Sequence, residues 1–156
     1  RASMIRRQLL QGVPLLLPAL LLFRPARAAA QNAGKPHRVA MQVDSNDPAL
    51  MNLALNNVSN IARYYADRGE AVEIEVVTYG PGLHMLRADT SPIKDRIKSL
   101  AAATPSLHFM ACANTRAGMA KAEGKEIPLI PEATVVPSGA VHLVARQEEG
   151  WSYLRP

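Results

Sequence analysis

The segment from residue 37 to residue 48, HRVAMQVDSNDP, decides the fold class. From Arg38 to Val43 the run is apolar enough to form a buried strand. The residues that follow begin a helix, because Asp47 is a good N-cap and proline is favoured at the first helical position, here Pro48. We therefore expect a strand that passes directly into a helix, which is the repeating unit of α/β domains.

The chain continues with a helix and a second strand. Apolar residues recur at intervals of three and four from Leu50 to Tyr65, until Gly69, which is typical of an amphipathic helix. Residues 72–79, VEIEVVTY, are rich in β-branched side chains and lead into the loop residues 80–82, GPG, so they predict a strand followed by a loop. A short helical turn is expected within residues 83–89.

The same alternation is repeated in the middle of the chain. Ser91 and Pro92 predict the start of a second helix that ends at Pro105, and residues 107–112 predict an apolar strand. Asn114 or Thr115 is expected to cap a third helix that ends near residue 124. Residues 125–134 predict an extended connection whose apolar side chains need cover, with another subunit as one source.

The C-terminal part completes the alternation. Residues 134–136 predict a short strand, 137–139 a turn and cap, 140–149 a helix broken at Gly150, and 151–154 a last strand. Strands that alternate with helices in one small domain imply a parallel sheet covered on both faces, with right-handed crossovers.

The N-terminal residues have the pattern of an export signal. Arg6 and Arg7 precede an apolar stretch from Leu9 to Phe23, and small residues follow it at 26–30. A membrane anchor is the competing interpretation, but the stretch is about 15 residues long and a spanning helix needs ~20. We expect a cleaved, twin-arginine-like signal peptide at 1–30, a flexible lead-in at 31–36, and one domain at 37–156. The mature protein is then periplasmic, without a membrane anchor.

Charge and cysteine content exclude several classes of function. Five of the 18 Lys and Arg residues, and none of the 13 Asp and Glu residues, lie within 1–30. The domain is therefore electrically balanced, which argues against nucleic acid or an acidic membrane surface as its partner. One Cys permits no intramolecular disulfide, and four scattered His give no zinc pattern. We expect no metal and no cofactor.

Candidate site residues follow from the expected sheet. In open α/β sheets, binding sites form beyond the carboxyl ends of the strands, where loops lead into helices. This rule selects polar or reactive residues after each strand: Asp44, Tyr79, Gly80, Cys112, Asn114 and Ser138.

Cys112 is the sharpest of these candidates, because the dipole of the helix that follows it favours a thiolate and Arg116 can add positive potential. The competing interpretation is a buried core thiol. Asp44 is either a general base or a helix cap. His84 and His108 are either proton donors or ordinary surface and core groups.

Four segments, taken in order, carry a resemblance to a known family. They are residues 76–83 (VVTYGPGL), 111–115 (ACANT), 135–141 (VVPSGAV) and 147–156 (QEEGWSYLRP). Over about residues 37–156 the chain resembles the exported single-domain branch of the DsrE/DsrF-like family. The resemblance implies a flavodoxin-like three-layer α/β/α sandwich with a mainly parallel sheet of about five strands. It also implies trimers or hexamers and, at Cys112, a cysteine that carries sulfane sulfur as a persulfide.

The resulting hypothesis is a periplasmic sulfur relay between donor and acceptor proteins. A thiolate at Cys112 would take up sulfane sulfur, Asn114, Thr115 and Ser138 would donate hydrogen bonds to the terminal sulfur, and segment 127–130 of a neighbouring subunit would exclude water. The alternative is a non-catalytic oligomer that binds a small ligand or a protein, with Cys112 as inert packing. An electron-transfer flavoprotein is a third possibility, suggested by the fold type alone; no phosphate-binding loop follows the first strand.

Overall fold

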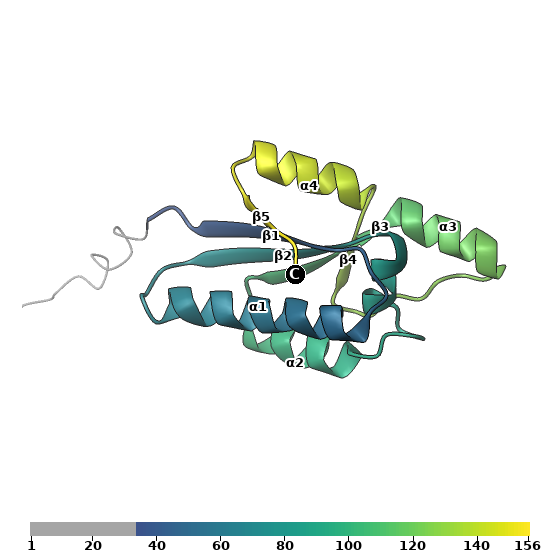
Figure 1. Ribbon diagram of the computed structural model, residues 1–156, viewed down its shortest axis with the longest axis horizontal. Coiled ribbons are helices and arrows are strands. Elements are labelled where there is room, and N and C mark those ends of the chain that lie inside the picture. Colours follow the sequence, from purple (N-terminus) through teal and green to yellow (C-terminus); the bar gives the residue numbers. More distant parts are fainter. Residues whose placement is uncertain (1–33) are drawn as a thin grey trace, which may run out of the picture. The chain divides into compact units, whose positions relative to one another are not determined.

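The computed structural model of the 156-residue chain describes residues 34–156. The expected signal peptide, 1–30, lies outside these residues, as does the first half of the expected lead-in. Five strands form one sheet in the order β4-β3-β2-β1-β5, and every neighbouring pair is parallel (Figure 1). The predicted flavodoxin-like α/β fold class is confirmed. Within residues 34–156 no helix is both long and apolar enough to cross a membrane.

Strands and helices alternate along the chain as follows: β1 (His37–Val43), α1 (Pro48–Ala66), β2 (Val72–Thr78), the 3₁₀ helix η2 (Gly80–Leu86), α2 (Lys94–Ala103), β3 (Leu107–Cys112), α3 (Ala113–Glu123), β4 (Ala133–Val136), α4 (Gly139–Glu148) and β5 (Ser152–Leu154). The strand predicted from Arg38 to Val43 is present and begins one residue earlier, at His37, and the helix begins at Pro48 with its Asp47 cap, whose carboxylate accepts the amide of Ala49 at 2.8 Å. The N-terminal βα unit therefore forms as its sequence predicts.

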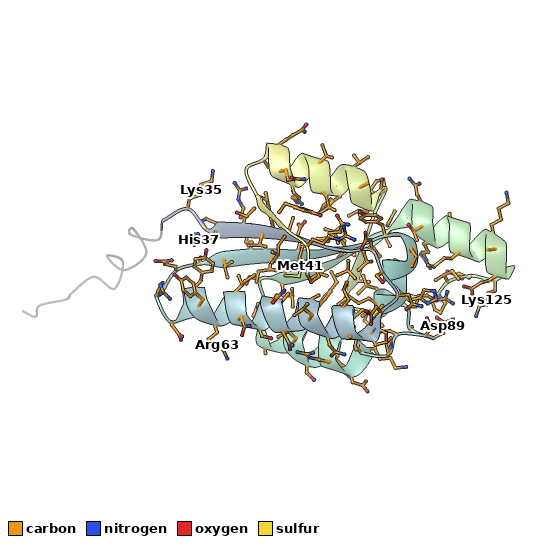
Figure 2. The ribbon with its side chains drawn as sticks, in the orientation of Figure 1. Lys35, His37, Met41, Arg63, Asp89 and Lys125 are labelled. Carbon is orange, nitrogen blue, oxygen red and sulfur yellow. The ribbon has the colours of Figure 1, made fainter. Side chains whose placement is uncertain are left out.

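Helices cover the two faces of the sheet unequally. Helices α1 and α2 lie on one face, where they bury the main core, and α4 lies on the other face (Figure 1). Met41 belongs to the main core and lies between the sheet and α1 (Figure 2). The α4 side has a smaller core of Ala40, Val77, Met110, Val136, Leu143 and Trp151. Because side chains alternate across a strand, Cys112 faces the α4 side, as Met110 does.

Two helices begin at other residues than the sequence predicts. Helix α2 begins at Lys94 rather than at Pro92, because the Ser91 hydroxyl donates to the carbonyl of Met85 at 2.6 Å and accepts the amide of Ile93 at 3.4 Å. These bonds hold residues 91–93 in a turn. Helix α3 is capped by Cys112 itself, so the expectation of an Asn114 or Thr115 cap was wrong.

The connection at 125–134 is covered by its own chain. Ile127 and Ile130 are buried, and the amide of Ile130 donates to the carbonyl of Leu86 at 3.0 Å. The amide of Ala88 donates to the carbonyl of Pro128 at 2.9 Å, which completes a short pairing of the two segments. The apolar side chains Ile127 and Ile130 are thus covered, as expected, but the cover comes from the same chain and not from another subunit, because 127–130 packs beside the end of η2.

An ionic cluster fastens α3 to the rest of the domain. Arg87 is 1% exposed and its guanidinium reaches Asp89 and Glu123, each at 2.9 Å. Lys125 lies 3.2 Å from Asp89, and the two side chains meet beyond the end of α3 (Figure 2). The bond to Arg87 holds the pKa of Asp89 well below its usual range and also lowers the pKa of Glu123. Helix α3, which has no buried residue, is therefore fixed at its C-terminal end by charge.

Candidate functional site at the carboxyl ends of the strands

The strand register brings most of the predicted site residues to one edge of the sheet. Val43 pairs with Thr78, Thr78 pairs with Ala111, and Cys112 pairs with Val136. The residues that follow these pairs lead into α1, η2, α3 and α4. Asp44, Tyr79, Cys112 and Ser138 therefore all lie at the carboxyl end of the sheet, as the sequence predicts for a parallel arrangement.

Cys112 lies at the junction between β3 and α3. Its side chain is the N-cap of α3, and its sulfur accepts the amide of Thr115 at 3.4 Å. The residue is only 4% exposed. The thiol is thus buried, as the competing interpretation expected, but it is buried against hydrogen-bond donors and not among hydrocarbon alone.

The donors around Cys112 change its acidity. Burial raises the pKa of the thiol, but the polar groups beside it, which are the Thr115 hydroxyl and the amides of Gly139, Thr115 and Asn114, outweigh burial. The pKa of Cys112 is therefore lowered from its ordinary value. The Thr115 amide lies in the first turn of α3, and a Cβ atom added to Gly139, the first residue of α4, would lie 3.4 Å from Cβ of Cys112, so the N-termini of two helices lie beside the thiol. This arrangement favours an anion at that position.

Gly139 belongs to the site, although its sequence context predicts only part of a turn. A Cβ atom added there would lie 3.0 Å from Cβ of Tyr79 and 3.4 Å from Cβ of Cys112. Glycine is needed here so that α4 can bring its first amide close to the sulfur. The turn Pro137-Ser138-Gly139 was visible in the sequence, but the approach of Tyr79 was not, because it depends on tertiary packing.

Several residues predicted to interact with the Cys112 sulfur bond to other groups. Arg116 donates to the carbonyl of Ile127 at 2.8 Å and to the carboxylate of Glu126 at 3.0 Å, so its charge is engaged away from the thiol. The Ser138 hydroxyl accepts the amide of Val141 at 3.5 Å and serves as the cap of α4. The Asn114 side chain is exposed, and its backbone amide donates to the carbonyl of Pro137 at 3.3 Å.

Thr115 and Gly80 are joined directly. The amide of Gly80 donates to Oγ1 of Thr115 at 2.9 Å. Gly80 has a φ of 50°, in the left-handed region that favours glycine, and this conformation belongs to the sharp turn at the end of β2. Both residues were predicted at the site, and the structure brings them into contact beside Cys112.

Asp44 belongs to a second polar cluster at the same edge. Its carboxylate accepts Gln42 at 2.9 Å and Arg155 at 3.2 Å, and the Tyr153 hydroxyl donates to Gln42 at 2.6 Å. Burial raises the pKa of Tyr79, Asp44 and Tyr153 add to that rise, and Arg155 opposes it. Asp44 does not cap α1, which is the role of Asp47. It instead connects the end of β1 to the C-terminal residues.

The histidines do not gather at this edge. His84 lies 3.0 Å from the Thr90 hydroxyl, and His108 is exposed on β3. Among residues 34–156, no group of three or more His, Cys, Asp or Glu side chains could hold a metal ion.

A buried charged cluster on the α4 side was not predicted. Glu75 on β2 is 3% exposed, and its carboxylate lies 2.6 Å from Nε2 of His142 and 2.9 Å from Nε of Arg146. The bond to Glu75 raises the pKa of Arg146. β2 contains two glutamates, of which Glu73 is exposed and Glu75 is buried, but the partners of Glu75 on α4 are 67 and 71 residues away and have no local pattern.

The grooves of the described residues do not open onto the Cys112 thiol. A groove of about 540 Å³ lies between the C-terminal ends of α1 and α2, beside the start of β2, and is lined mainly by small apolar residues. It is therefore at the opposite end of the sheet from Cys112. A groove of about 310 Å³ runs along α3, lined by Ala113, Ala117 and Ala120 and by Val135 of β4.

The comparisons with known proteins agree with the fold and leave the activity open. No protein-family model and no curated protein matches the chain. A solved structure does match, that of MTH1491 from Methanobacterium thermoautotrophicum, a protein of unknown function, with 36% sequence identity and a TM-score of 0.65. The match covers 77% of this chain and 99% of MTH1491. The chain belongs to the same family as MTH1491. Because the function of MTH1491 is unknown, the function of the present chain has to be argued from its own site.

Proposed function

We propose that the protein carries sulfane sulfur as a persulfide on Cys112, as its resemblance to the DsrE/DsrF-like family also suggests. The observation that carries this proposal is the bond from the Thr115 amide to the Cys112 sulfur at the start of α3, with the start of α4 beside the thiol, together with the lowered pKa of the thiol. A packing cysteine needs no such donors, whereas a thiolate or persulfide anion is stabilised by them.

The transfer step needs no external oxidant. The Cys112 thiolate attacks the outer sulfur of a donor persulfide, R–S–SH, and a new bond forms between Sγ and that sulfur. The S–S bond of the donor breaks at the same time, and the donor leaves as a thiolate that takes up the proton. Cys112 then holds the sulfur as Cys–S–S⁻, and an acceptor thiolate can remove it by the same exchange.

The low exposure of Cys112 limits which sulfur donors can reach its thiol. At 4% exposure the sulfur is reached only when neighbouring side chains move, so small donors such as polysulfide should react faster than bulky thiol reagents. Tyr79 packs against Gly139 beside the thiol and is one of the groups that would have to shift. We expect sulfur donor and acceptor proteins to present the sulfur on a flexible segment for the same reason.

The most direct experiment measures the mass of the intact protein after incubation with polysulfide. The proposal expects a gain of one or more sulfur atoms that is reversed by reductant, is absent in Cys112→Ser, and passes to a small acceptor thiol. Absence of an adduct on the folded wild-type protein would overturn it.

The burial of Cys112 favours a second candidate, a non-catalytic binding module in which the thiol is packing. If the protein is such a binding module, polysulfide should add no sulfur to it and should leave its stability unchanged. The Cys112→Ser variant would then bind the unknown ligand as the wild type does, because the thiol takes no part.

We also propose a homo-oligomer, a trimer or hexamer as the family resemblance implies. Val141 and Val144 on the outer face of α4 are 67% and 53% exposed, and α3 has no buried residue. Exposed apolar side chains grouped on one face are typical of subunit contacts. Light scattering should give a multiple of the chain mass, and Val141→Glu with Val144→Glu should lower it. Lys98→Glu, on the exposed surface of α2, is the matched control.

Export to the periplasm remains part of the proposal and rests on residues 1–30 alone. It expects a mature protein shortened at its N-terminus in a bacterial periplasmic fraction. A full-length protein in the cytoplasmic fraction would contradict it.

A further inference from the structure

We propose that α4 and β5, residues 139–154, form a lid that opens as one unit away from the sheet, and that the buried Glu75 carboxylate holds this lid closed. The inference goes beyond the proposed function, because the lid opens whether or not Cys112 carries sulfur. It gives a role to the buried cluster of Glu75, His142 and Arg146, which sulfur transfer does not use.

The place of the lid in the fold allows it to move without disturbing the other strands. Strand β5 is the outermost strand beside β1, and the two pair over three residues, from Val39 with Ser152 to Met41 with Leu154. Strands β1 and β2, in contrast, pair over seven residues. Helix α4 lies on the face opposite to α1 and α2 (Figure 1). Four strands and the main core therefore stay together when the lid opens.

Apolar packing attaches the lid to the sheet weakly. The buried residues of α4 are Gly139 and Leu143, and all three residues of β5 are exposed or partly exposed. From the segment between them, Trp151 joins Leu143 in the smaller core. Segments with few buried apolar contacts are the ones that open locally in native proteins. The lid has this property, and the elements around the main core do not.

Glu75 supplies the main polar attachment of the lid. It lies on β2, the central strand of the sheet, and is 3% exposed. Its Oε2 atom accepts Nε2 of His142 at 2.6 Å and Nε of Arg146 at 2.9 Å. These two residues are four positions apart and so lie one above the other on the same side of α4. A single carboxylate oxygen therefore holds two successive turns of the helix.

The cluster also reaches the segment that leads into β5. The guanidinium carbons of Arg38 and Arg146 lie 5.6 Å and 5.0 Å from the centre of the Trp151 ring, within the range of a cation–π contact. Arg38 also donates to the carbonyl of Glu149 at 3.0 Å. Because Arg146 contacts both Glu75 and Trp151, the loss of Glu75 should loosen α4 and β5 together.

An attachment through buried charges is suited to a segment that has to separate from the sheet. Charged groups regain their hydration when they part, so a buried ion cluster opposes separation less than well-packed apolar side chains of the same volume do. Removal of one partner, however, leaves the other charge uncompensated. The cluster therefore holds the lid closed only while Glu75 is present, and it permits opening at a lower cost than the main core would.

Opening of the lid uncovers the carboxyl end of β3. A Cβ atom added at Gly139, the first residue of the lid, would lie 3.4 Å from Cβ of Cys112, and Cys112 is 4% exposed. When α4 moves away, this cover moves with it. The Cys112 thiol is therefore a built-in reporter of the open state.

The first test is hydrogen exchange of the full chain at urea concentrations below the unfolding transition. In the wild type, the amides of α4 and β5 should exchange through an opening that depends weakly on urea, because it exposes little surface, and those of α1 and β2 through global unfolding. Leu55→Ala, in the main core, should speed exchange in α1 by more than about a hundredfold and leave exchange in the lid unchanged. Equal urea dependence of the lid and α1 in the wild type, or equal acceleration of both in Leu55→Ala, would overturn the inference.

The second test concerns the role of Glu75. Glu75→Gln should speed exchange of the lid amides about tenfold to a hundredfold, because the charge of Arg146 loses its partner. Glu73→Gln is the matched control, since Glu73 lies on the same strand and the same face but is exposed, and it should leave the exchange rate unchanged. If Glu75→Gln does not fold, His142→Ala replaces it and should speed the exchange about tenfold. A lid that exchanges at the wild-type rate in the Glu75 or His142 variant would overturn the role of the cluster.

The third test measures how fast iodoacetamide labels Cys112. The rate should rise in Glu75→Gln by the same factor as exchange of the α4 amides, and it should stay at the wild-type value in Glu73→Gln and Leu55→Ala. Equal labelling rates in Glu75→Gln and the wild type would overturn the inference that the lid covers the end of β3. A protein that passes these tests but gains no sulfur mass from polysulfide refutes sulfur carriage and leaves the lid intact.

Discussion

The two faces of the sheet are built for different purposes. The face under α1 and α2 is closed by a large apolar core in which Leu55, Ile97 and Phe109 are almost completely buried. The face under α4 has a much smaller core, and it also buries the Glu75 carboxylate and the Cys112 thiol. The indole N–H of Trp151, on the same face, is buried with no hydrogen-bond partner among the described residues. The main apolar core thus lies on one face of the sheet, and the buried Glu75 carboxylate and Cys112 thiol lie on the other.

The largest difference between the two faces is expected in the stability lost when a buried leucine is replaced by alanine. Leu55→Ala, in the main core, should destabilise the protein by about 4 kcal/mol, and Leu143→Ala, under α4, by about 2 kcal/mol, since the cost rises with the cavity that cannot collapse. Urea unfolding of both variants measures the difference. If Leu143→Ala lost as much stability as Leu55→Ala, or more, the two faces would not differ in how they stabilise the fold.

Replacing Gly139 or Gly118 by alanine should change the stability of the protein in opposite directions. Gly139→Ala should destabilise the protein, by about 1–3 kcal/mol, because the new Cβ is forced against Tyr79 and Cys112. Gly118→Ala, in the middle of α3 with open space around it, should stabilise by about 0.5–1 kcal/mol. Thermal unfolding of both variants shows whether each substitution lowers or raises the stability of the protein. A tolerated alanine at 139 would mean that the approach of α4 to the sulfur is loose.

A smaller effect is expected at the Arg87 cluster, and it should depend on pH. The folded-state pKa values of Asp89 and Glu123 are lowered by Arg87, so this cluster stabilises the fold above the ordinary carboxyl pKa and loses that contribution as the pH falls. Glu123→Gln should therefore be less stable than the wild type at neutral pH. The difference in free energy of unfolding between the two proteins should become smaller at acidic pH.

The control for that prediction is Glu126→Gln. Its carboxylate is mostly exposed and pairs only with Arg116, so its removal should change little at any pH. Denaturant unfolding at neutral and acidic pH checks both variants. A gap that widens in acid would contradict the assignment of the lowered pKa values to the cluster.

Local patterns in the sequence predicted the elements of the fold well. The run from Arg38 to Val43, the Asp47 cap and the Gly124 end of α3 all depend on neighbouring residues, and each was placed correctly. The start of α2 was missed, because the Ser91 hydroxyl turns back to a carbonyl in η2. That bond depends on how the loop folds and leaves no local pattern.

The site was predicted in position but not in detail. The rule of strand ends predicts Cys112 and Gly80 at the site, and Thr115, expected there as a hydrogen-bond donor, bonds to both of them. Arg116, expected to add positive potential at the thiol, pairs with Glu126, and the sequence gives no reason to select Gly139. Sequence indicates which residues reach the edge of a sheet, but the partners they choose there depend on side-chain directions that only the packed structure fixes.

Polar groups at the starts of two helices are expected to make the buried Cys112 thiol acidic. The direct measurement is the pH midpoint of thiolate absorbance in the wild-type protein, with Cys112→Ser subtracted. We expect a midpoint below that of a free cysteine, about 8.5, even though burial alone would raise it. A midpoint at or above that value would show that burial prevails, and Cys112 would then be a packing residue.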